Sequence, residues 1–138
     1  MEQPLVQTQY GWGSGRAHED VHSFLGIPYA KPPVGPLRFL PPEPPAPWQG
    51  TRRADAYGDG PIQYAETGFT TIPAYAQDRT LEPPQHFSED CLTLNIWRPA
   101  HSNRPLPVLF WIYGGAYAMG NAAMALYSGE AMAREGAV

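Results

Sequence analysis

Two glycines and an alanine, Gly114-Gly115-Ala116, directly follow the apolar run from Val108 to Tyr113. Acyl-transfer enzymes need backbone N–H groups fixed where negative charge develops on a carbonyl oxygen. A loop of small residues can supply them as an oxyanion hole, because it lets the substrate come close to the backbone. Paired glycines can also serve only as the tight turn that ends a strand. The aromatic residues Tyr113 and Tyr117 and the nearby Gly120 favour the oxyanion hole.

A pair of carboxylates, Glu89 and Asp90, stands just before an alternating segment. Adjacent carboxylates can bind a metal or transfer protons, but no histidine cluster accompanies them. A buried ion pair that anchors the entrance to a strand is the favoured interpretation. Arg38 stands among apolar residues and needs a carboxylate, which either Glu89 or Asp90 could supply. We therefore predict no metal site and no cofactor site.

Nucleophilic catalysis by serine needs an exposed serine, a histidine and an acid in one geometry. No serine of this sequence stands in a Gly-x-Ser-x-Gly elbow, and the triplet Gly13-Ser14-Gly15 lacks that spacing. The sequence has four histidines, His18, His22, His86 and His101, but geometry and not mere presence defines a triad. A complete Ser-His-acid triad is therefore not expected within these 138 residues.

Composition and charge exclude several classes of partner. The net charge of −4 and nine scattered Lys and Arg residues argue against nucleic acid. The longest apolar run is too short to cross a bilayer, and no signal peptide is visible, so we predict no membrane contact. The single cysteine, Cys91, cannot form an internal disulfide, which is typical of the cytoplasm. Neither the oligomeric state nor a protein partner can be predicted from the sequence.

The elements that must position these residues divide the chain into an extended half and a mixed half. One domain is expected over residues 1–138. Leu5–Tyr10 and Val21–Leu25, with a turn at Glu19-Asp20, predict a small antiparallel meander. The proline-dense arm from Pro28 to Pro47 should wrap over a surface, because a residue before proline favours extended geometry. An alternative is that the arm is a polyproline ligand, although its aromatic and β-branched residues favour packing on its own sheet.

The second half shows the clearest periodicity. Leu92–Trp97 alternates with period two, and Val108–Tyr113 is a continuous apolar run typical of a central strand, so we predict an antiparallel hairpin. Ser128–Glu135 predicts a short helix with Ser128 as N-cap and Gly136 just past its end. Ala137-Val138 would begin another strand, and such a series is an α/β signature. Residues 57–87 have no periodicity, which predicts a long ordered loop or flap.

Several blocks of sequence stand in a fixed order along nearly the whole chain: Phe24–Gly35, Leu37–Phe39, Pro44-Pro45, Trp48, Asp55–Gly58, Gln63, Ser88–Leu92, Leu94-Asn95, Trp111–Ala116 and Gly120. Together they resemble the N-terminal part of the type B carboxylesterase/cholinesterase family, and its bacterial para-nitrobenzyl-esterase-like branch most closely. The resemblance implies the N-terminal portion of an α/β-hydrolase fold: a small antiparallel meander, then the first strands of the central sheet and the oxyanion loop.

The resemblance also implies a function. A serine carboxylesterase hydrolyses small-molecule carboxylic esters through an acyl-enzyme, without a cofactor. The N–H groups of Gly115 and Ala116 would be oxyanion-hole donors, Gly114 would give the loop its bend, and Arg38 with Glu89 would form a structural ion pair. The family's serine, acid and histidine would lie beyond Val138, so this chain alone is expected to be inactive. A non-catalytic cholinesterase-like interaction protein is the alternative, which the lone cysteine disfavours.

Three positions depart from the family pattern. Many relatives pair a cysteine at the place of Cys91 with one at the place of Pro61, so the loop from Pro61 to Phe87 is expected to be unstapled and mobile. Leu81 stands where cholinesterases have the tryptophan that stacks on choline, so capture of a quaternary ammonium is not expected. Tyr113 replaces a histidine of many bacterial members, as it does in cholinesterase-like members.

Overall fold

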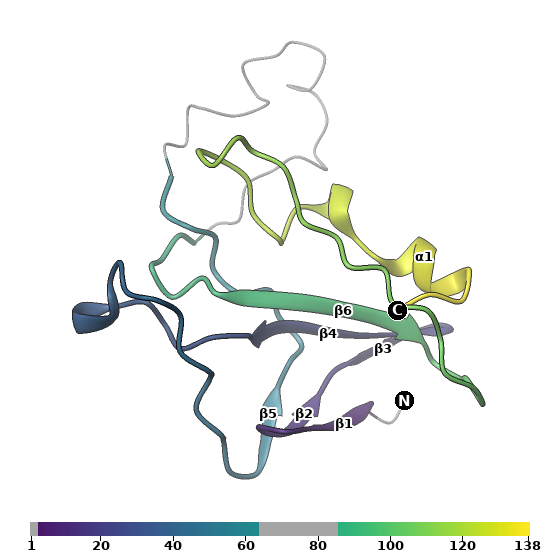
Figure 1. Cartoon of the computed structure of the whole chain (residues 1–138). Coiled ribbons are helices and arrows are strands. Elements are labelled where there is room, and N and C mark those ends of the chain that lie inside the picture. Colours follow the sequence, from purple (N-terminus) through teal and green to yellow (C-terminus); the bar gives the residue numbers. More distant parts are fainter. Residues whose placement is uncertain (1–2, 64–85) are drawn as a thin grey trace.

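The computed structural model describes residues 3–63 and 86–138, and these residues contain two three-stranded sheets (Figure 1). The first sheet has the order β1-β2-β5, in which β1 and β2 are antiparallel and β2 and β5 are parallel. The second sheet has the order β3-β4-β6 and is antiparallel throughout. The strands are β1 (Leu5–Thr8), β2 (Gly11–Ser14), β3 (Arg16–His18), β4 (Val21–Pro28), β5 (Thr51–Arg53) and β6 (Thr93–Pro99).

The antiparallel strands predicted for the N-terminal residues are present, as two hairpins, β1-β2 and β3-β4, that belong to different sheets. Strands β3 and β4 form a hairpin whose turn is Glu19-Asp20, with Glu19 in the left-handed region at φ 52°. The two sheets are joined through Ala54, whose N–H donates to Ser14 O at 2.7 Å and whose carbonyl accepts the N–H of Leu25 at 2.8 Å. Buried Val21, Phe24 and Leu25 of β4 form the centre of the core, since β4 lies in the middle of its sheet.

A bulge interrupts the pairing of β4 with β6 between Phe24 and Ile27. Gly26 occupies it with φ 65°, and a Cβ there would lie 2.6 Å from the carbonyl oxygen of Ala56, so only glycine fits. The N–H of Gly26, which the bulge frees from the ladder, donates to Oδ1 of Asn95 on β6 at 3.0 Å. The bulge therefore ties β4 to the neighbouring strand through a side chain.

The proline-dense arm forms no layer of the fold, as predicted, and after Pro28 its only regular element is one short 3₁₀ turn, η1 (Gly35–Leu37). The N–H of Lys31 donates to the carbonyl of Glu43 at 2.9 Å, and the two side chains form an ion pair at 2.6 Å. In Figure 1 the arm projects to one side of both sheets, and most of its residues are exposed. Lys31 and Glu43 thus hold the two limbs of the arm to each other.

The C-terminal residues lie on the opposite side of the β3-β4-β6 sheet from the first sheet (Figure 1). They include η4 (Ala125–Tyr127) and α1 (Glu130–Arg134), and α1 packs on β6 and β4 through buried Ala133. The helix is shorter than predicted, because Gly129 and not Ser128 is its N-cap. Gly136 ends it with φ 90°, as predicted. Within the described ranges, no helix has the length and hydropathy needed to cross a membrane.

The predicted hairpin of Leu92–Trp97 with Val108–Tyr113 is wrong. The first segment forms β6, but β6 pairs with β4, and residues 108–113 are not in a strand. Their neighbourhood makes two ladder-like hydrogen bonds, from Leu109 N–H to Val138 O at 2.7 Å and from Val138 N–H to Pro107 O at 2.9 Å. Prolines at 99, 105 and 107 remove backbone donors from a direct return of the chain along β6.

Candidate active site

The loop from Gly114 to Gly120 is a compact turn with unusual backbone geometry. Gly115, Ala116 and Tyr117 are consecutive residues with positive φ, at 143°, 52° and 60°, and Gly120 follows with φ 96°. The N–H groups of Ala118 and Met119 both donate to the carbonyl of Gly115, at 3.0 and 3.1 Å. Left-handed alanine and tyrosine are strained, and such strain is concentrated at functional sites.

Gly115 gives the loop its bend. A Cβ on Gly115 would collide with the carbonyl oxygen of Met119, whereas a Cβ on Gly114 would meet no atom within 4 Å. Gly114 is also not among the residues with positive φ. The role expected of Gly114 in the loop geometry stays a prediction, whereas at Gly115 the turn itself requires a residue without a side chain.

The N–H groups of Gly115 and Ala116 have no acceptor in the described part of the chain. The internal hydrogen bonds of the turn run from the N–H groups of Ala118 and Met119 to the carbonyl of Gly115. The N–H groups of Gly115 and Ala116 come earlier in the chain and take no part in these bonds. Successive N–H groups in such a turn form a concavity that can hold an anion. The arrangement can thus supply two neighbouring backbone donors to an oxygen that carries negative charge.

Aromatic rings lie beneath this loop. Tyr113 stacks on Tyr127 with ring centroids 6.1 Å apart and an interplanar angle of 21°, and Trp111 lies 6.1 Å from Tyr127. A Cβ on Gly120 would lie 3.2 Å from the ring of Tyr113, so this ring limits that end of the loop. Burial, and then the neighbouring Cys91, Tyr29 and Tyr127, raises the pKa of Tyr113, which keeps its hydroxyl neutral at physiological pH.

The predicted ion pair between Arg38 and Glu89 is close but not buried. Arg38 Nε lies 2.6 Å from Glu89 Oε1, and the two side chains are 51% and 36% exposed. Asp90 does not pair with Arg38; its N–H donates to Oγ of Ser88 at 3.0 Å. The pair thus connects the proline arm to the entrance of β6 at the surface, where solvent weakens its contribution.

Among the described residues, no hydrogen bond joins a serine hydroxyl to a histidine. Each serine hydroxyl that forms a hydrogen bond there has a backbone partner. His22 lies on β4, where burial, and then the charges of Arg98 and His101, lowers its pKa. No group of acidic, histidine and cysteine residues in residues 3–63 and 86–138 could hold a metal ion. Leu81 and most of the loop from Pro61 to Phe87 lie outside the described residues.

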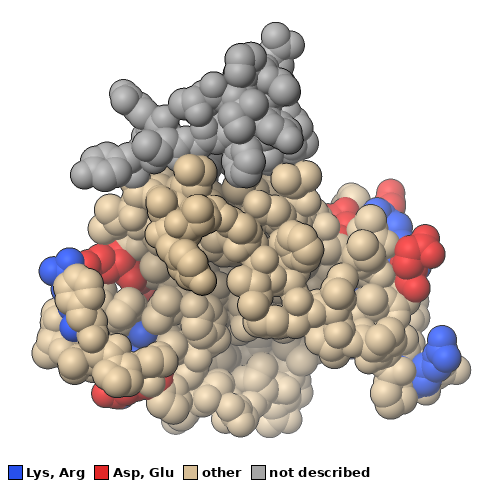
Figure 2. Space-filling view, turned by 45° about the horizontal axis from the view of Figure 1, so that its top comes forward, with Lys and Arg blue, Asp and Glu red and all other residues tan. Residues whose placement is uncertain are grey.

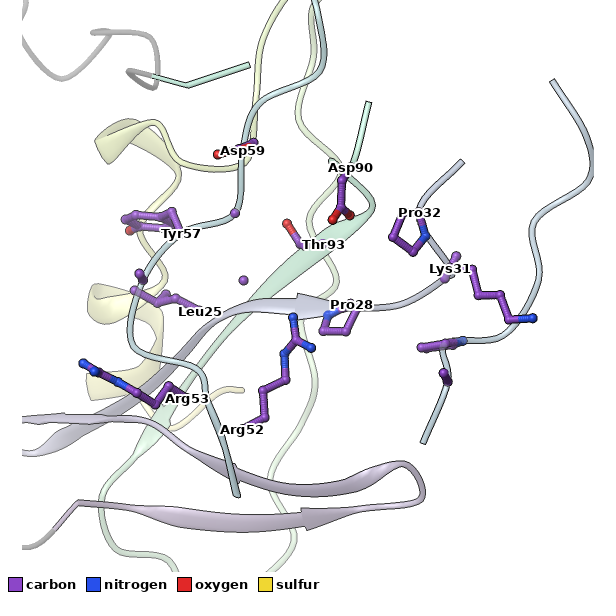
Figure 3. A pocket seen from close by; sticks show the side chains of 16 residues that line it. Leu25, Pro28, Lys31, Pro32, Arg52, Arg53, Tyr57, Asp59, Asp90 and Thr93 are labelled. Atoms are coloured by element: carbon purple, nitrogen blue, oxygen red, sulfur yellow. The ribbon is translucent and has the colours of Figure 1, made fainter. Parts of the chain in front are cut away.

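A cavity of about 480 Å³ lies away from this loop, between the proline arm, β5 and the start of β6. Figure 3 shows Arg52 reaching toward Pro28 and Thr93, with Asp59 and Asp90 on the other side and Arg53 directed away. Lys31 also lines it but is paired with Glu43. None of residues 114–120 lines this cavity, so it is separate from the candidate site.

Two amide side chains that contact the segment after the turn had no role predicted from sequence. Gln63 is bonded to Gly120, and Asn95 donates to the carbonyl of Ala122 at 2.9 Å. Both residues stand in the blocks that carry the family resemblance, but nothing in their local sequence indicates which loop they contact. Their separation from the loop, 57 positions for Gln63, is the reason.

Comparison with known proteins connects this geometry to a family. The model of the carboxylesterase family matches residues 2–138. The chain is 39% identical over 141 residues to para-nitrobenzyl esterase of Bacillus subtilis (strain 168), which covers 100% of this chain and 26% of the relative. It is 41% identical over 140 residues to carboxylesterase 5A of Mus musculus, covering 96% and 24%. The chain belongs to the carboxylesterase family.

Solved structures of carboxylesterases have the same fold. A PNB esterase superposes with a TM-score of 0.81 at 39% identity, covering 96% of this chain and 25% of that one. A carboxylesterase of Geobacillus stearothermophilus gives 0.75 at 42% identity, covering 94% and 24%. These matches confirm the predicted family and the N-terminal portion of an α/β hydrolase. The chain spans about a quarter of the length of the carboxylesterases that it matches.

Proposed function

We propose that this chain belongs to a serine carboxylesterase that hydrolyses small-molecule carboxylic esters, and that Gly115 and Ala116 form part of its oxyanion hole. The observation that supports this most strongly is the pair of adjacent N–H groups that have no acceptor among residues 3–63 and 86–138, held in a positive-φ turn that only glycine at position 115 permits. Membership of the carboxylesterase family supplies the reaction class.

The two donors would act on charge that is absent from the substrate and appears during the reaction. When a serine oxygen attacks the ester carbonyl carbon, the carbonyl oxygen becomes an oxyanion. Backbone N–H groups already fixed near that position stabilise the transition state without reorganising. Residues 105–129 contain no Lys, Arg, Asp or Glu, so no charged side chain of this segment competes with the N–H dipoles.

The remaining catalytic groups would come from outside these 138 residues. In the proposed reaction a histidine accepts the serine proton and returns it to the leaving alcohol, which leaves an acyl-serine. Water, deprotonated by the same histidine, then releases the acid and restores the serine. In this proposal the 138-residue chain alone has no activity, and it contributes donors and part of the wall of the site.

The test compares the full-length gene product with the 138-residue chain. Both are incubated with p-nitrophenyl acetate and with an organophosphonate, and labelled serines are located by mass spectrometry. We expect turnover and one stoichiometric label in the full-length protein, on a serine that is not in residues 1–138, and neither in the short chain. A stoichiometric label on a serine of the short chain would overturn the proposal that the catalytic serine lies outside residues 1–138. A folded full-length protein without turnover or label would favour a non-catalytic interaction protein.

We also propose the cytoplasm as the compartment, because the only cysteine of the sequence has no internal partner. In the structure Cys91 is half-buried, and burial, followed by the nearby Asp90, raises the pKa of its thiol, which suits an unreactive reduced cysteine. Recovery of the protein outside the cytoplasmic fraction of its cells would contradict this proposal.

A further inference from the structure

A single side chain, that of Gln63, holds both backbone groups of Gly120. Nε2 of Gln63 donates to the carbonyl of Gly120 at 2.9 Å, and Oε1 accepts the N–H of Gly120 at 2.9 Å. Nε2 also donates to the carbonyl of Pro61 at 3.1 Å, which fixes the side chain to its own segment. The amide thus makes the same pair of hydrogen bonds to Gly120 that the backbone of a neighbouring strand would make, although the two residues are 57 positions apart.

Gly120 is the residue through which the turn closes. A Cβ on Gly120 would lie 2.8 Å from the carbonyl oxygen of Gly114, so the two backbones are in close contact. The preceding residue, Met119, donates its N–H to the carbonyl of Gly115. Fixing Gly120 therefore fixes both ends of the segment that presents the N–H groups of Gly115 and Ala116.

The anchor continues past Gly120. Asn95 donates to the carbonyl of Ala122 at 2.9 Å, while its Oδ1 accepts the N–H of Gly26 in the β4 bulge at 3.0 Å. This second amide connects the segment after the turn to the central sheet, but it contacts residues farther from the candidate donors than Gln63 does. In Figure 1 the teal segment that carries Gln63 rises toward the yellow-green loop.

We infer that Gln63 is a positioning residue that sets the oxyanion-hole geometry of this esterase, an inference that rests on the proposed function. Glutamine suits this place because it donates and accepts at once without adding a charge beside a developing oxyanion. A glutamate of the same length would keep the acceptor for Gly120 N–H. It would set a carboxylate oxygen against the carbonyl of Gly120 and a negative charge near the oxyanion.

The experiment uses the full-length gene product and the variants Gln63→Ala and Gln63→Glu, with Gln9→Ala as a control. Gln9 is an exposed glutamine in the turn between β1 and β2. For p-nitrophenyl acetate we expect kcat to fall about 10- to 100-fold in both Gln63 variants, because misplacement of about 1 Å can cost 10²-fold. KM should change less than about threefold, because positioning acts on the transition state, and the rate of organophosphonate inactivation should fall with kcat.

The outcomes separate this inference from the proposed function. A wild-type protein without serine-dependent turnover would overturn the proposed function and this inference with it. An active wild type whose Gln63→Ala variant keeps kcat within about twofold, as Gln9→Ala should, would overturn this inference alone. If Gln63→Ala fails to fold, the Gln63→Glu variant decides: unchanged kcat in the folded variant contradicts a positioning role, and a loss of kcat at constant KM supports it.

Discussion

Strand β4 and residues 108–113 differ in how far their apolar side chains are buried. In the N-terminal sheets, Phe24 on β4 is 3% exposed, and β4 lies between β3 and β6. In the C-terminal half, Phe110 and Ile112 are 75% and 77% exposed, within an uncharged segment from residue 105 to 129. Figure 2 shows a face over these elements on which Lys, Arg, Asp and Glu appear only toward the edges.

This difference shows that an apolar segment is buried only where neighbouring strands cover it. Strand β4 has β3 and β6 on its two sides, and all three are among the described residues. Among the described residues, the backbone of residues 108–113 bonds only to Val138, and the side chains from Val108 to Ile112 are more than half exposed. The loop from Gly114 to Gly120 follows this exposed segment, and its far end is held by the side chain of Gln63, while Asn95 bonds to Ala122 just past the loop.

The largest expected change is in the free energy of unfolding. Phe24→Ala should destabilise the chain by about 3–5 kcal/mol, since it removes a buried aromatic ring and leaves a cavity. Phe110→Ala, the same substitution at an exposed position, should change the free energy of unfolding by less than about 0.5 kcal/mol. Urea unfolding of the 138-residue chain measures both. Equal losses at the two positions would show that the C-terminal half is buried in solution.

The next effect concerns the loop. Gly115→Ala should lower kcat/KM for p-nitrophenyl acetate about 10²- to 10³-fold in the full-length protein, as the loss of an oxyanion donor does. The reason is the collision of its Cβ with the carbonyl of Met119. Gly114→Ala adds the same methyl group where no atom lies within 4 Å, so its loss should be much smaller. The reverse order would return the bend to Gly114 and contradict the structure.

A smaller effect is expected where the arm meets β6. In a double-mutant cycle of Arg38→Ala and Glu89→Ala, the coupling energy should be about 0.2–1 kcal/mol, because both side chains are partly solvated. Thermal or urea unfolding of the four proteins measures it, and high salt should reduce it. A coupling of several kcal/mol would mean that the pair is buried in solution, as the sequence predicted.

The smallest effect is the pH dependence that His22 contributes. Its pKa in the folded chain is lowered, chiefly by burial, so the unfolded chain binds the proton more tightly. Its contribution to stability is present above the unfolded value near 6.5 and is lost as pH falls through the lower folded value. His22→Asn should flatten the stability profile in this acidic window and leave it unchanged above pH 7. An identical profile would show that His22 is solvated.

Sequence patterns predicted the elements better than their partners. The alternation of residues 92–97 predicted β6, because period two reports which faces a strand presents. It could not show that β6 pairs with β4, since that contact depends on a chain reversal elsewhere. Likewise the Gly114-Gly115-Ala116 motif predicted a loop with free donors, whereas only the backbone dihedral angles assign the bend to Gly115. The role of Gln63 depends on a contact across 57 positions, which no local pattern carries.

The central claim is that the backbone N–H groups of Gly115 and Ala116 stabilise an oxyanion. Replacing Ala116 by lactic acid in the full-length protein turns one amide into an ester, which removes that N–H while keeping the side chain. If Ala116 N–H is an oxyanion donor, kcat for p-nitrophenyl acetate falls about 10²-fold or more with little change in KM, because the donor acts only on the transition state. A kcat equal to that of the unmodified protein would contradict it.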